Sequence, residues 1–297
     1  MQLSIIIINY NTFNLTCNCL ASVFNSVKNI DFEVILVDNA SSECPPSVFK
    51  EKFPEITLLP QQSNLGFAGG NNVGLTAATG NIVLLLNSDT EIVGDAINVS
   101  YDYLLKRQEV GVMSCKLVYP SGEVQGCCQR FPTIALEFYE LSRIQKLFGK
   151  RRAKIMQGFF FDHLTEMEAG WVWGTFFMIK RDVINKLKDQ KFPDDYFMYG
   201  EDMQWCYIIH KMGYKIMYYP AGTVIHYVAM SSSSDINFDK QRLMMGHEFS
   251  FLTASYGGVS ARLIFVLRSL NYFTLFRYGN RFIKLGKQYF RRAVFEY

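Results

Sequence analysis

Short apolar runs alternate with segments of helical spacing through the first third of the chain. The pattern predicts strands at residues 3–9, 32–37, 56–59 and 81–86, with helices at residues 12–26 and 68–79. Alternation of this kind builds a parallel sheet with helices on both faces. The composition agrees, because 49% hydrophobic and only 19% charged residues in a chain of 297 exclude a disordered or fibrous protein. We therefore expect an α/β fold.

Polar residues follow three of the predicted strands, at the edge of the sheet where open α/β proteins bind ligands. They are Asn9-Tyr10-Asn11, Asp38-Asn39 and Asn87-Ser88-Asp89. Asp38 could accept a hydrogen bond from the imide NH of a nucleobase, and Tyr10 could stack on that base. Plainer roles fit as well, since an Asp after a strand often caps a turn and a Tyr often packs. We expect the three strand ends to converge on one crevice.

A glycine-rich segment opens the helix predicted at residues 68–79. It reads Asn64-Leu65-Gly66-Phe67-Ala68-Gly69-Gly70-Asn71-Asn72. Backbone N–H groups at a helix start suit a phosphate group, although glycines can also serve close packing there. The first strand-to-helix turn lacks GxGxxG, which disfavours a nicotinamide enzyme, and the chain has no GxxxxGK[ST] phosphate loop of an ATPase.

Four side chains are candidates for metal binding or proton transfer. Asp89 follows a buried strand and offers the hard oxygen ligand that Mg²⁺ or Mn²⁺ prefers. His226 ends an apolar strand and could supply a second ligand, although a lone His is often structural. Glu201 and Asp202 begin a helix predicted at residues 201–212, where burial would raise a carboxylate pKa toward the range of an acid or base. The helix dipole alone would also favour this pair.

The second half of the chain has a less regular pattern. Alternation weakens through residues 110–131 and leads into a basic segment at 149–152, which we interpret as an insertion or lid. Regular patterning returns with a strand at 169–179 and a short helix that Asp182 would cap. Residues 239–297 are predicted to be mostly helical.

Charge is divided unevenly along the chain. Residues 1–258 carry 22 Lys and Arg against 26 Asp and Glu, whereas residues 259–297 carry eight against one. Aromatic and aliphatic residues alternate with these cations, as is typical of a helix on an anionic membrane surface. A helix that packs on the rest of the chain with a solvated basic face fits the pattern too. No nucleic-acid-binding motif accompanies the charge, so we expect no nucleic acid partner.

Three features of the sequence bear on its location. No uncharged apolar stretch reaches the roughly 20 residues of a spanning helix, and the N-terminus lacks the basic region and cleavage site of a signal peptide. The seven cysteines are odd in number and have no paired CxxC spacing, which predicts reduced thiols. We expect a cytoplasmic protein.

Six motifs, in this order, resemble those of the family 2 inverting glycosyltransferases of GT-A fold, especially their bacterial rhamnosyltransferase-like branch. They are SIIIINYN, VDNASS, NLGFAGGNN, LLLNSDT, GWVWGTFFMIKR and YFMYGEDMQWC. The resemblance implies a nucleotide-sugar-binding fold, with a mostly parallel central sheet flanked by helices. It implies a catalytic domain at residues 1–235, with a donor half at about 1–110 and an acceptor half at about 111–235. Residues 236–297 would form a helical, basic extension that associates with a membrane.

The resemblance also implies a role for each matching residue. The nucleotide-sugar would be bound by Asn9, Tyr10, Asp38, Asn64, Gly66, Phe67, Gly70, Asn71, Asn87, Ser88, Trp173 and Gly174. Tyr10 and Asp38 would bind the base, and the N–H groups near Gly69 and Gly70 would stabilise the diphosphate. Asp89 and His226 would hold Mg²⁺ or Mn²⁺. Asp202 would be the general base, and Glu201 would orient the acceptor or the helix start.

Two departures from the family pattern stand out. Asn87 occupies the position where the Asp-x-Asp metal motif often has its first Asp. Gln204 and Ile208 occupy positions where an acidic residue and an arginine often follow the Glu-Asp pair. Neither departure removes the predicted base.

The implied reaction is transfer of a sugar, with inversion, from a nucleotide diphosphate donor. The branch implies L-rhamnose from dTDP-rhamnose, moved to a lipid-linked or polysaccharide acceptor in cell-surface glycan synthesis at the inner face of the cell membrane. A UDP-sugar donor is an alternative to dTDP-rhamnose. A second alternative is that the chain is an inactive GT-A module that acts as a membrane-bound scaffold. The presence of Asp38, Asp89, Asp202 and His226 together argues against this second alternative.

Overall fold

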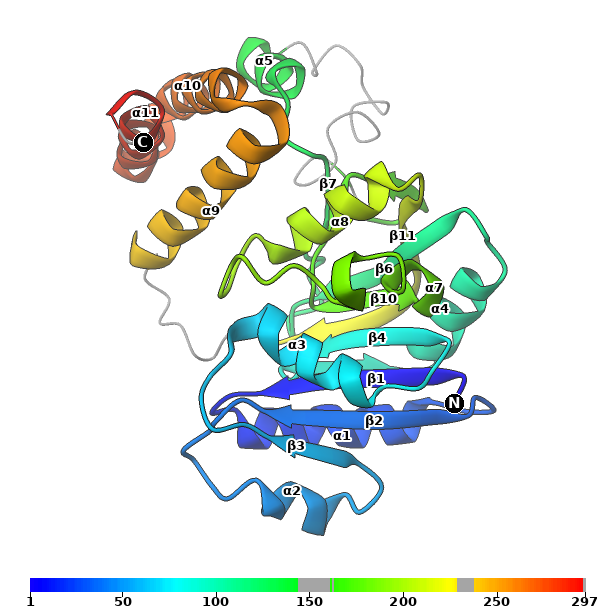
Figure 1. The fold of residues 1–297 in the computed structure, drawn as a ribbon. Helices are drawn as coiled ribbons and strands as arrows, with labels where there is room; N and C mark the ends of the chain where they lie inside the picture. The colour runs from blue at the N-terminus through cyan, green and yellow to red at the C-terminus, as the bar shows by residue number, and fades with distance from the viewer. Residues whose placement is uncertain (144–160, 162, 229–237, 296–297) are drawn as a thin grey trace. The chain divides into compact units, whose positions relative to one another are not determined.

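The computed structural model describes residues 1–143, 161, 163–228 and 238–295 (Figure 1). These residues form two compact units, one within residues 1–129 and 162–230, the other within residues 130–161 and 231–297. The boundary predicted at residue 235 falls among residues that the structure does not describe. The basic segment at 149–152, predicted to be an insertion or lid, also lies outside the described residues.

A nine-stranded sheet forms the centre of the first unit. Its strands are β1 (Leu3–Asn9), β2 (Phe32–Asp38), β3 (Thr57–Pro60), β4 (Ile82–Asn87), β5 (Thr90–Val93), β6 (Val110–Val118), β8 (Met167–Ala169), β10 (Phe176–Lys180) and β11 (Lys215–His226). They are ordered β3-β2-β1-β4-β10-β6-β11-β5, and β8 pairs with β11. Six strands run in one direction, and β5, β8 and β10 oppose them. The predicted mostly parallel sheet is confirmed.

Helices cover this sheet on both faces. They are α1 (Phe13–Ser26), α2 (Ser47–Lys52), α3 (Gly66–Ala77), α4 (Ala96–Leu105), α7 (Arg181–Ile184) and α8 (Glu201–Lys211), with a short 3-10 turn at Lys188–Gln190. Figure 1 shows α1 and α3 on opposite faces. The connections after β1 and β2 lead toward β3, and the connection through α3 returns to β4 on the far side of β1. The order in which successive strands are added to the sheet therefore reverses between β1 and β4, and such a point is where sheets of this kind open a binding crevice.

The core of this unit consists of apolar runs that are buried on both sides of the sheet. The fully buried apolar side chains of two neighbouring inner strands are Leu3, Ile5, Ile6 and Ile7 of β1, and Val83, Leu84 and Leu85 of β4. A strand covered by helices on both faces needs a continuous apolar run. This requirement explains why β1 and β4 are evident from the sequence.

Three predictions for the middle of the chain are wrong. The strand expected at 169–179 is divided among β8, β9 (Trp171–Val172) and β10, because β9 leaves the main sheet to pair with β7 (Cys128–Gln129). Residues 110–118, expected to be irregular, form β6, which is buried over almost its whole length and so shows no alternation. Asp182 does not cap α7, because the helix begins at Arg181 and Asp182 lies in its first turn.

The second unit is helical, as predicted for residues 239–297. It contains α5 (Ile134–Ser142), α9 (Phe238–Tyr256), α10 (Gly258–Thr274), a 3-10 turn at Phe276–Tyr278 and α11 (Asn280–Phe295). α10 packs against α5, α9 and α11. Residues 130–143 thus pack with the C-terminal helices, whereas the sequence predicts them in the first domain. None of the described helices is long and apolar enough to cross a membrane.

A buried cluster of charges joins three helices of the second unit. The Arg268 guanidinium of α10 pairs with Glu137 of α5, and its Nη1 lies 2.5 Å from Glu248 Oε1 of α9. Burial by itself would lower the pKa of Arg268, but the two carboxylates outweigh it and raise that pKa above its ordinary value. Beside this cluster, Asn271 Nδ2 donates to Glu140 Oε2 at 3.2 Å. These contacts explain why α5 belongs to this unit.

Candidate active site

The carboxyl ends of β1, β2 and β4 meet at one edge of the sheet, as predicted. In the parallel register Asn9 lies opposite Asp38, and Ile8 lies opposite Asn87. β11 runs in the same direction, so His226 at its end reaches the same edge. The structure therefore brings the three predicted strand ends and His226 to one edge of the first unit.

Asn9 is a buried hub that connects the first two strand ends. Its Nδ2 donates to Asp38 Oδ1 at 2.7 Å and to Ser41 Oγ at 2.8 Å. Its Oδ1 accepts from Thr16 Oγ1 at 2.8 Å and from Thr12 Oγ1 at 3.1 Å. Both N–H donors and both acceptor positions of the Asn9 side-chain amide are therefore used within the protein. Asn9 therefore positions Asp38 rather than offering a free amide to a ligand.

Asp38 and Tyr10 differ sharply in exposure. Asp38 is 1% exposed and also accepts from the Ser41 N–H at 3.1 Å, whereas the Tyr10 side chain is 46% exposed. A carboxylate has about four acceptor positions, so these two bonds leave Asp38 capacity for another donor. The Tyr10 ring is accessible for stacking.

Asn39 organises the glycine-rich segment, and sequence reasoning did not assign it a role. Its Nδ2 donates to Asn64 Oδ1 at 2.9 Å and to the Gly66 carbonyl at 3.0 Å, and its Oδ1 accepts from the Leu65 N–H at 3.0 Å. Asn64 Oδ1 also accepts from the Gly66 N–H at 2.9 Å. The end of β2 is thereby tied to the start of α3.

The predicted phosphate cradle at the start of α3 is not supported. The N–H groups of Leu65 and Gly66 already have acceptors, and the Phe67 N–H donates to the Phe197 carbonyl at 2.9 Å. Gly69 and Gly70 lie beyond the first turn of a helix that begins at Gly66, where N–H groups bond to carbonyls of the preceding turn. Gly66 has φ +73°, and a Cβ there would lie 2.2 Å from the Phe197 carbonyl oxygen. The alternative of glycines selected for close packing is the better account.

The rest of the segment anchors α3. A Cβ at Gly70 would lie 3.0 Å from the Ile8 side chain of β1, and a Cβ at Gly74 would clash with the Ile6 side chain of the same strand. The helix therefore approaches β1 closely. Asn71 Nδ2 donates to the Phe67 carbonyl at 3.0 Å. Asn72 makes two 2.9 Å bonds with the backbone of Phe192, which leads toward α8.

The end of β4 is held from two sides. The Asn87 N–H donates to the Thr175 carbonyl at 3.0 Å, and Asn87 Nδ2 lies 3.5 Å from Thr175 Oγ1. Ser88 Oγ lies 3.1 Å from Thr12 Oγ1 at the start of α1. Asn87 thus contacts the turn before β10, which the sequence did not predict.

Asp89 and His226 form a close pair, as their predicted common role requires. His226 Nε2 lies 3.4 Å from Asp89 Oδ1, and both side chains are largely buried. The antiparallel pairing of β11 with β5 places His226 opposite Thr90, and the Tyr227 N–H donates to the Asp89 carbonyl at 2.9 Å. Sheet pairing therefore holds the two residues together.

Gln125 determines the orientation of the His226 ring, and sequence reasoning missed it. Gln125 Nε2 donates to the His226 carbonyl at 2.8 Å, so Oε1 is the amide atom that faces His226 Nδ1, also at 2.8 Å. Nδ1 must then carry a proton and donate it. In the neutral ring, Nε2 presents a lone pair toward Asp89, which is how a histidine binds a metal ion. Among the described residues, no three His, Cys, Asp or Glu side chains are grouped to hold a metal.

The Glu201–Asp202 pair begins α8 and contacts the turn before β10. Asp202 Oδ2 accepts from the Gly174 N–H at 3.2 Å, and its Oδ1 accepts from the Met203 N–H at 2.8 Å. Glu201 is buried, and its Oε2 has no hydrogen-bond partner among the described residues. Burial raises the pKa of both carboxyls, to about 8 for Glu201 and about 6 for Asp202, and the charge of Asp202 contributes to the rise at Glu201.

Gly174 lies between α3 and α8. A Cβ at this position would lie 2.8 Å from the Phe67 ring and 3.9 Å from the Asp202 Cβ. Its neighbour Trp173 donates its N–H to the Cys127 carbonyl at 3.2 Å. The predicted donor residues Phe67, Trp173 and Gly174 are thus on segments that adjoin the carboxylate pair.

The family model described as Glycosyl transferase family 2 matches residues 4–188, which is more than half of the chain. The chain belongs to glycosyltransferase family 2. The matched region includes β1 to β4, the glycine-rich segment, Asp89 and the Trp173–Gly174 turn. It ends before α8 and β11, which carry Asp202 and His226.

Curated relatives of this family 2 glycosyltransferase include a bacterial enzyme. The N-acetylglucosaminyl-diphospho-decaprenol L-rhamnosyltransferase of Mycobacterium tuberculosis is 22% identical over 223 residues, which is 68% of this chain and 68% of the relative. The chain is therefore similar to a rhamnosyltransferase over about two thirds of its length.

Solved structures show the same fold. The mannosyltransferase PcManGT from Pyrobaculum calidifontis, in complex with GDP-Man and Mn²⁺, superposes with a TM-score of 0.62 at 17% identity. The superposition covers 99% of this chain and 86% of the PcManGT chain. S. aureus TarS 1–349 has a TM-score of 0.56 at 13% identity and covers 99% of this chain and 90% of its own. This family 2 glycosyltransferase has the GT-A fold that the sequence motifs predicted.

Proposed function

We propose that the chain is an inverting, metal-dependent glycosyltransferase that moves L-rhamnose from dTDP-rhamnose to a lipid-linked glycan in cell-surface polysaccharide synthesis. The observation that carries this proposal is the Asp89–His226 pair, with the His226 ring oriented by Gln125, in a member of this family. The relative in M. tuberculosis, named as an N-acetylglucosaminyl-diphospho-decaprenol L-rhamnosyltransferase, supports the sugar and the acceptor class.

Asp89 and His226 fit a divalent cation. Two ligands that are each about 2.1 Å from one ion are separated by roughly 3.0–3.4 Å, and the pair is 3.4 Å apart. The structural neighbour solved with GDP-Man and Mn²⁺ supports a cation of this kind. Such a cation would neutralise the negative charge that develops on the departing diphosphate.

The residues of this chain then divide the remaining work. Tyr10 stacks on the nucleobase, and Asp38, held by Asn9, accepts from its imide N–H. An Asp202 oxygen takes the proton of the acceptor hydroxyl while the hydroxyl oxygen bonds to the anomeric carbon. The bond from that carbon to the diphosphate breaks on the opposite face, so the configuration inverts. Glu201, whose pKa is raised by burial and by the neighbouring Asp202 charge, orients the acceptor or the start of α8.

The activity should decline with unit slope as the pH falls below about 6. Asp202 acts as a base only when ionised, and burial raises its pKa to about 6, so protonation removes the base in this range. The measurement is kcat/KM against pH. The series is run at two saturating Mn²⁺ concentrations, so that a change in cation binding can be told apart from loss of the base. An acid limb that moves with Mn²⁺ concentration would contradict the assignment to Asp202.

Binding of dTDP should depend on the cation and on the orientation of His226. Calorimetric titration with dTDP and UDP, each with and without Mn²⁺, tests the donor class. Replacement of Gln125 with Leu should weaken Mn²⁺-dependent binding about 10–100-fold, because the ring loses the partner that fixes its tautomer. His210→Ala, an exposed His on α8, is the matched control and should bind normally.

The outcomes of the titration separate the alternatives. Tighter binding of UDP than of dTDP would exclude the dTDP-rhamnose donor and favour a UDP-sugar. Absence of binding to either nucleotide in any condition would favour the inactive scaffold.

We also propose that the enzyme is cytoplasmic and peripheral on the inner face of the cell membrane, bound through residues 259–297. Exposed apolar side chains in this segment support the proposal, and Val259 of α10 (76%) and Tyr278 (74%) are the most exposed. Lys287 and Arg291 are exposed cations of α11. Apolar side chains beside cations are typical of a helix at an anionic bilayer surface.

A further inference from the structure

Three aromatic side chains are exposed among the described residues of the first unit. They are Tyr10 (46%), Tyr119 (38%) and Phe197 (54%). Tyr10 already has a role in the proposed function, as the ring that stacks on the nucleobase, whereas Phe197 has none. Exposure alone decides nothing, because single apolar side chains are common on protein surfaces. The way Phe197 is held, and what it is held against, distinguish it.

Phe197 is fixed on the start of α3. Its carbonyl accepts from the Phe67 N–H at 2.9 Å. Its ring lies against Gly66, where a Cβ would be 2.8 Å from the ring atom Cδ2. Five positions earlier in the chain, the backbone of Phe192 makes two 2.9 Å bonds with Asn72 of α3. The segment is thus attached to α3 at two points, so little conformational freedom is lost when a ligand stacks on the ring.

The chain turns sharply between Phe197 and α8. Tyr199 has φ +70° and Gly200 has φ +103°, both in the left-handed region. A residue other than glycine stays in that region only where its surroundings hold it there. The turn allows the Phe197 ring to lie on α3 while Asp202, five positions later, accepts from the Gly174 N–H at 3.2 Å. The same segment therefore carries the ring and leads into the predicted base.

A short series of contacts connects Phe197 to Asp38. Asn39 follows Asp38 at the end of β2, and its Nδ2 donates to the Gly66 carbonyl at 3.0 Å. Gly66 is the residue against which the Phe197 ring lies. The ring is therefore one residue away from the side chain that follows Asp38, on the side of the sheet that α3 covers.

Tyr10 is connected to Asp38 from the other side. It follows Asn9, whose Nδ2 donates to Asp38 Oδ1 at 2.7 Å, and it leads into α1. α1 and α3 cover opposite faces of the sheet (Figure 1). The segments that carry the two exposed rings thus come to the end of β2 from opposite faces. A nucleobase has two flat faces, so a base whose imide N–H reaches Asp38 can have one ring on each.

We propose that Phe197 stacks on the nucleobase of the donor, on the face opposite to Tyr10. This inference rests on the proposed function and adds a second aromatic contact to the same site. Stacking on an aromatic side chain depends little on which base is present. The contact therefore strengthens donor binding without choosing between dTDP and UDP, and it can be tested with either nucleotide.

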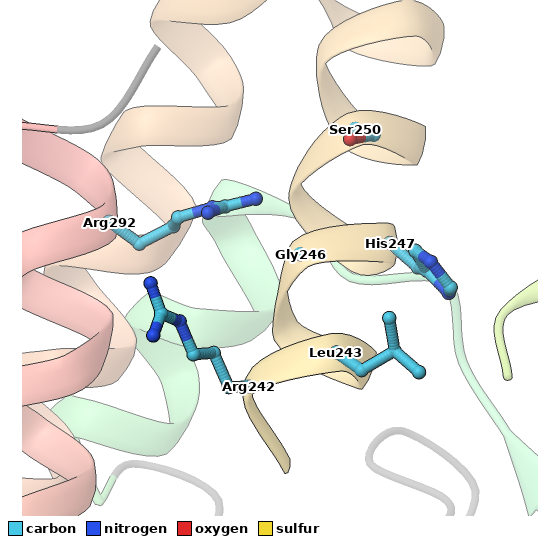
Figure 2. Close-up of a pocket in the computed structure, with 6 residues that line it drawn as sticks. All are labelled: Arg242, Leu243, Gly246, His247, Ser250 and Arg292. Atoms are coloured by element: carbon cyan, nitrogen blue, oxygen red, sulfur yellow. The ribbon is translucent and has the colours of Figure 1, made fainter. Parts of the chain in front are cut away.

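A pocket of about 380 Å³ in the second unit offers no comparable surface (Figure 2). Its lining, from α9 and α11, consists of Arg242, Leu243, Gly246, His247, Ser250 and Arg292. None of these is a Phe, Tyr or Trp, the side chains on which bases most often stack. The aromatic contacts of the base are therefore assigned to the first unit.

The test is calorimetric titration of the full chain with dTDP and with UDP, each in the presence of Mn²⁺. Phe197→Ala should weaken binding of both nucleotides by similar factors of at least about fivefold, because one stacked ring is lost. Tyr119→Ala is the matched control. Tyr119 is an exposed ring that follows β6 at the same edge, three strands from β1 and so roughly 14 Å away, and its loss should change binding by no more than about twofold.

Two further variants separate stacking from packing on Gly66. Phe197→Leu keeps an apolar side chain against Gly66 but has no flat ring, so it should lose nearly as much affinity as Phe197→Ala. Phe197→Tyr keeps the ring and should bind within about twofold of the native protein. Circular dichroism of each variant verifies that the fold is retained.

Each contrary result has a definite meaning. Native binding by Phe197→Ala would remove the ring from the base site and leave the proposed function standing. Native binding by Phe197→Leu, or an equal loss in Phe197→Tyr and Phe197→Ala, would show that Phe197 acts through packing and would overturn the stacking proposal. An equal loss in Tyr119→Ala would show that the effect is not specific and would overturn it too. Absence of binding by the native protein to either nucleotide would overturn the proposed function and the stacking contact together.

Discussion

Replacement of Asp202 with Asn should lower the rate of sugar transfer by about 10²–10⁴-fold, the usual contribution of a general base. Asn has nearly the same volume, and its single carbonyl oxygen can keep one of the two hydrogen bonds that Asp202 accepts, from the Gly174 N–H or from the Met203 N–H. It cannot take a proton from the acceptor. The measurement is the single-turnover rate with saturating donor, together with calorimetric binding of dTDP. Donor binding should change by no more than about threefold.

Two further variants make this result specific. Asp195 is an exposed carboxylate that precedes α8 and accepts a hydrogen bond at 2.7 Å from Nε2 of Gln204, a residue of α8. The Asp195→Asn variant should transfer sugar at nearly the rate of the native enzyme. Glu201→Gln should lower the rate by a smaller factor than Asp202→Asn and keep the acid limb of the pH profile. If Asp202→Asn retains turnover while Glu201→Gln abolishes it, the base is Glu201, whose buried Oε2 would then be the proton acceptor.

Replacement of Arg268 with Met should destabilise the second unit by about 3–5 kcal/mol, because Glu137 and Glu248 would be left as buried charges without their counter-ion. The three tryptophans, Trp171, Trp173 and Trp205, all belong to the first unit, whereas α9, α10 and α11 contribute much of the helix content. Urea unfolding followed by far-ultraviolet circular dichroism should therefore shift to lower urea. Tryptophan emission should shift less.

The matched controls separate lost charge pairing from lost packing. Arg277→Met replaces an exposed arginine and should change stability by about 0.5 kcal/mol or less. Adding Glu137→Gln and Glu248→Gln to Arg268→Met removes the uncompensated charges and should recover part of the loss. Failure of this triple variant to recover any stability would mean that the packing of the Arg268 side chain, and not its charge, holds the helices.

The strongest local signals predicted the elements that carry the first half of the site. Continuous apolar runs predicted β1, β2 and β4, and clear helical spacing predicted α1 and α3. Both signals can be recognised without knowing which distant residues these elements contact. β5 and β8 have four and three residues, too few for a period to be visible. The place of β10 between β4 and β6 depends on pairing between segments far apart in the chain. No local pattern contains that information.

The candidate site was predictable where a charged or aromatic residue follows a strand. Tyr10, Asp38, Asp89 and His226 fit this rule, and the structure does gather their strands at one edge. Gln125 was not predictable, because a neutral amide is common in loops and its partner lies 101 residues later. The acceptors that occupy the N–H groups at the start of α3 were not predictable for a similar reason. The glycine spacing does not reveal that the Phe197 carbonyl occupies the N–H of Phe67.

The buried pair of Arg268 and Glu137 has a consequence for the order of synthesis. The two residues are 131 positions apart, and a chain grows from its N-terminus. α5 therefore emerges long before α10 exists, and during that interval the Glu137 carboxylate has no arginine to pair with. The sheet from β1 to β11 can be completed in the meantime, since it requires nothing beyond His226. The helical unit is thus the last part of this protein to mature, and a nascent chain cut short before Arg268 would carry a finished sheet with an unassembled helix α5.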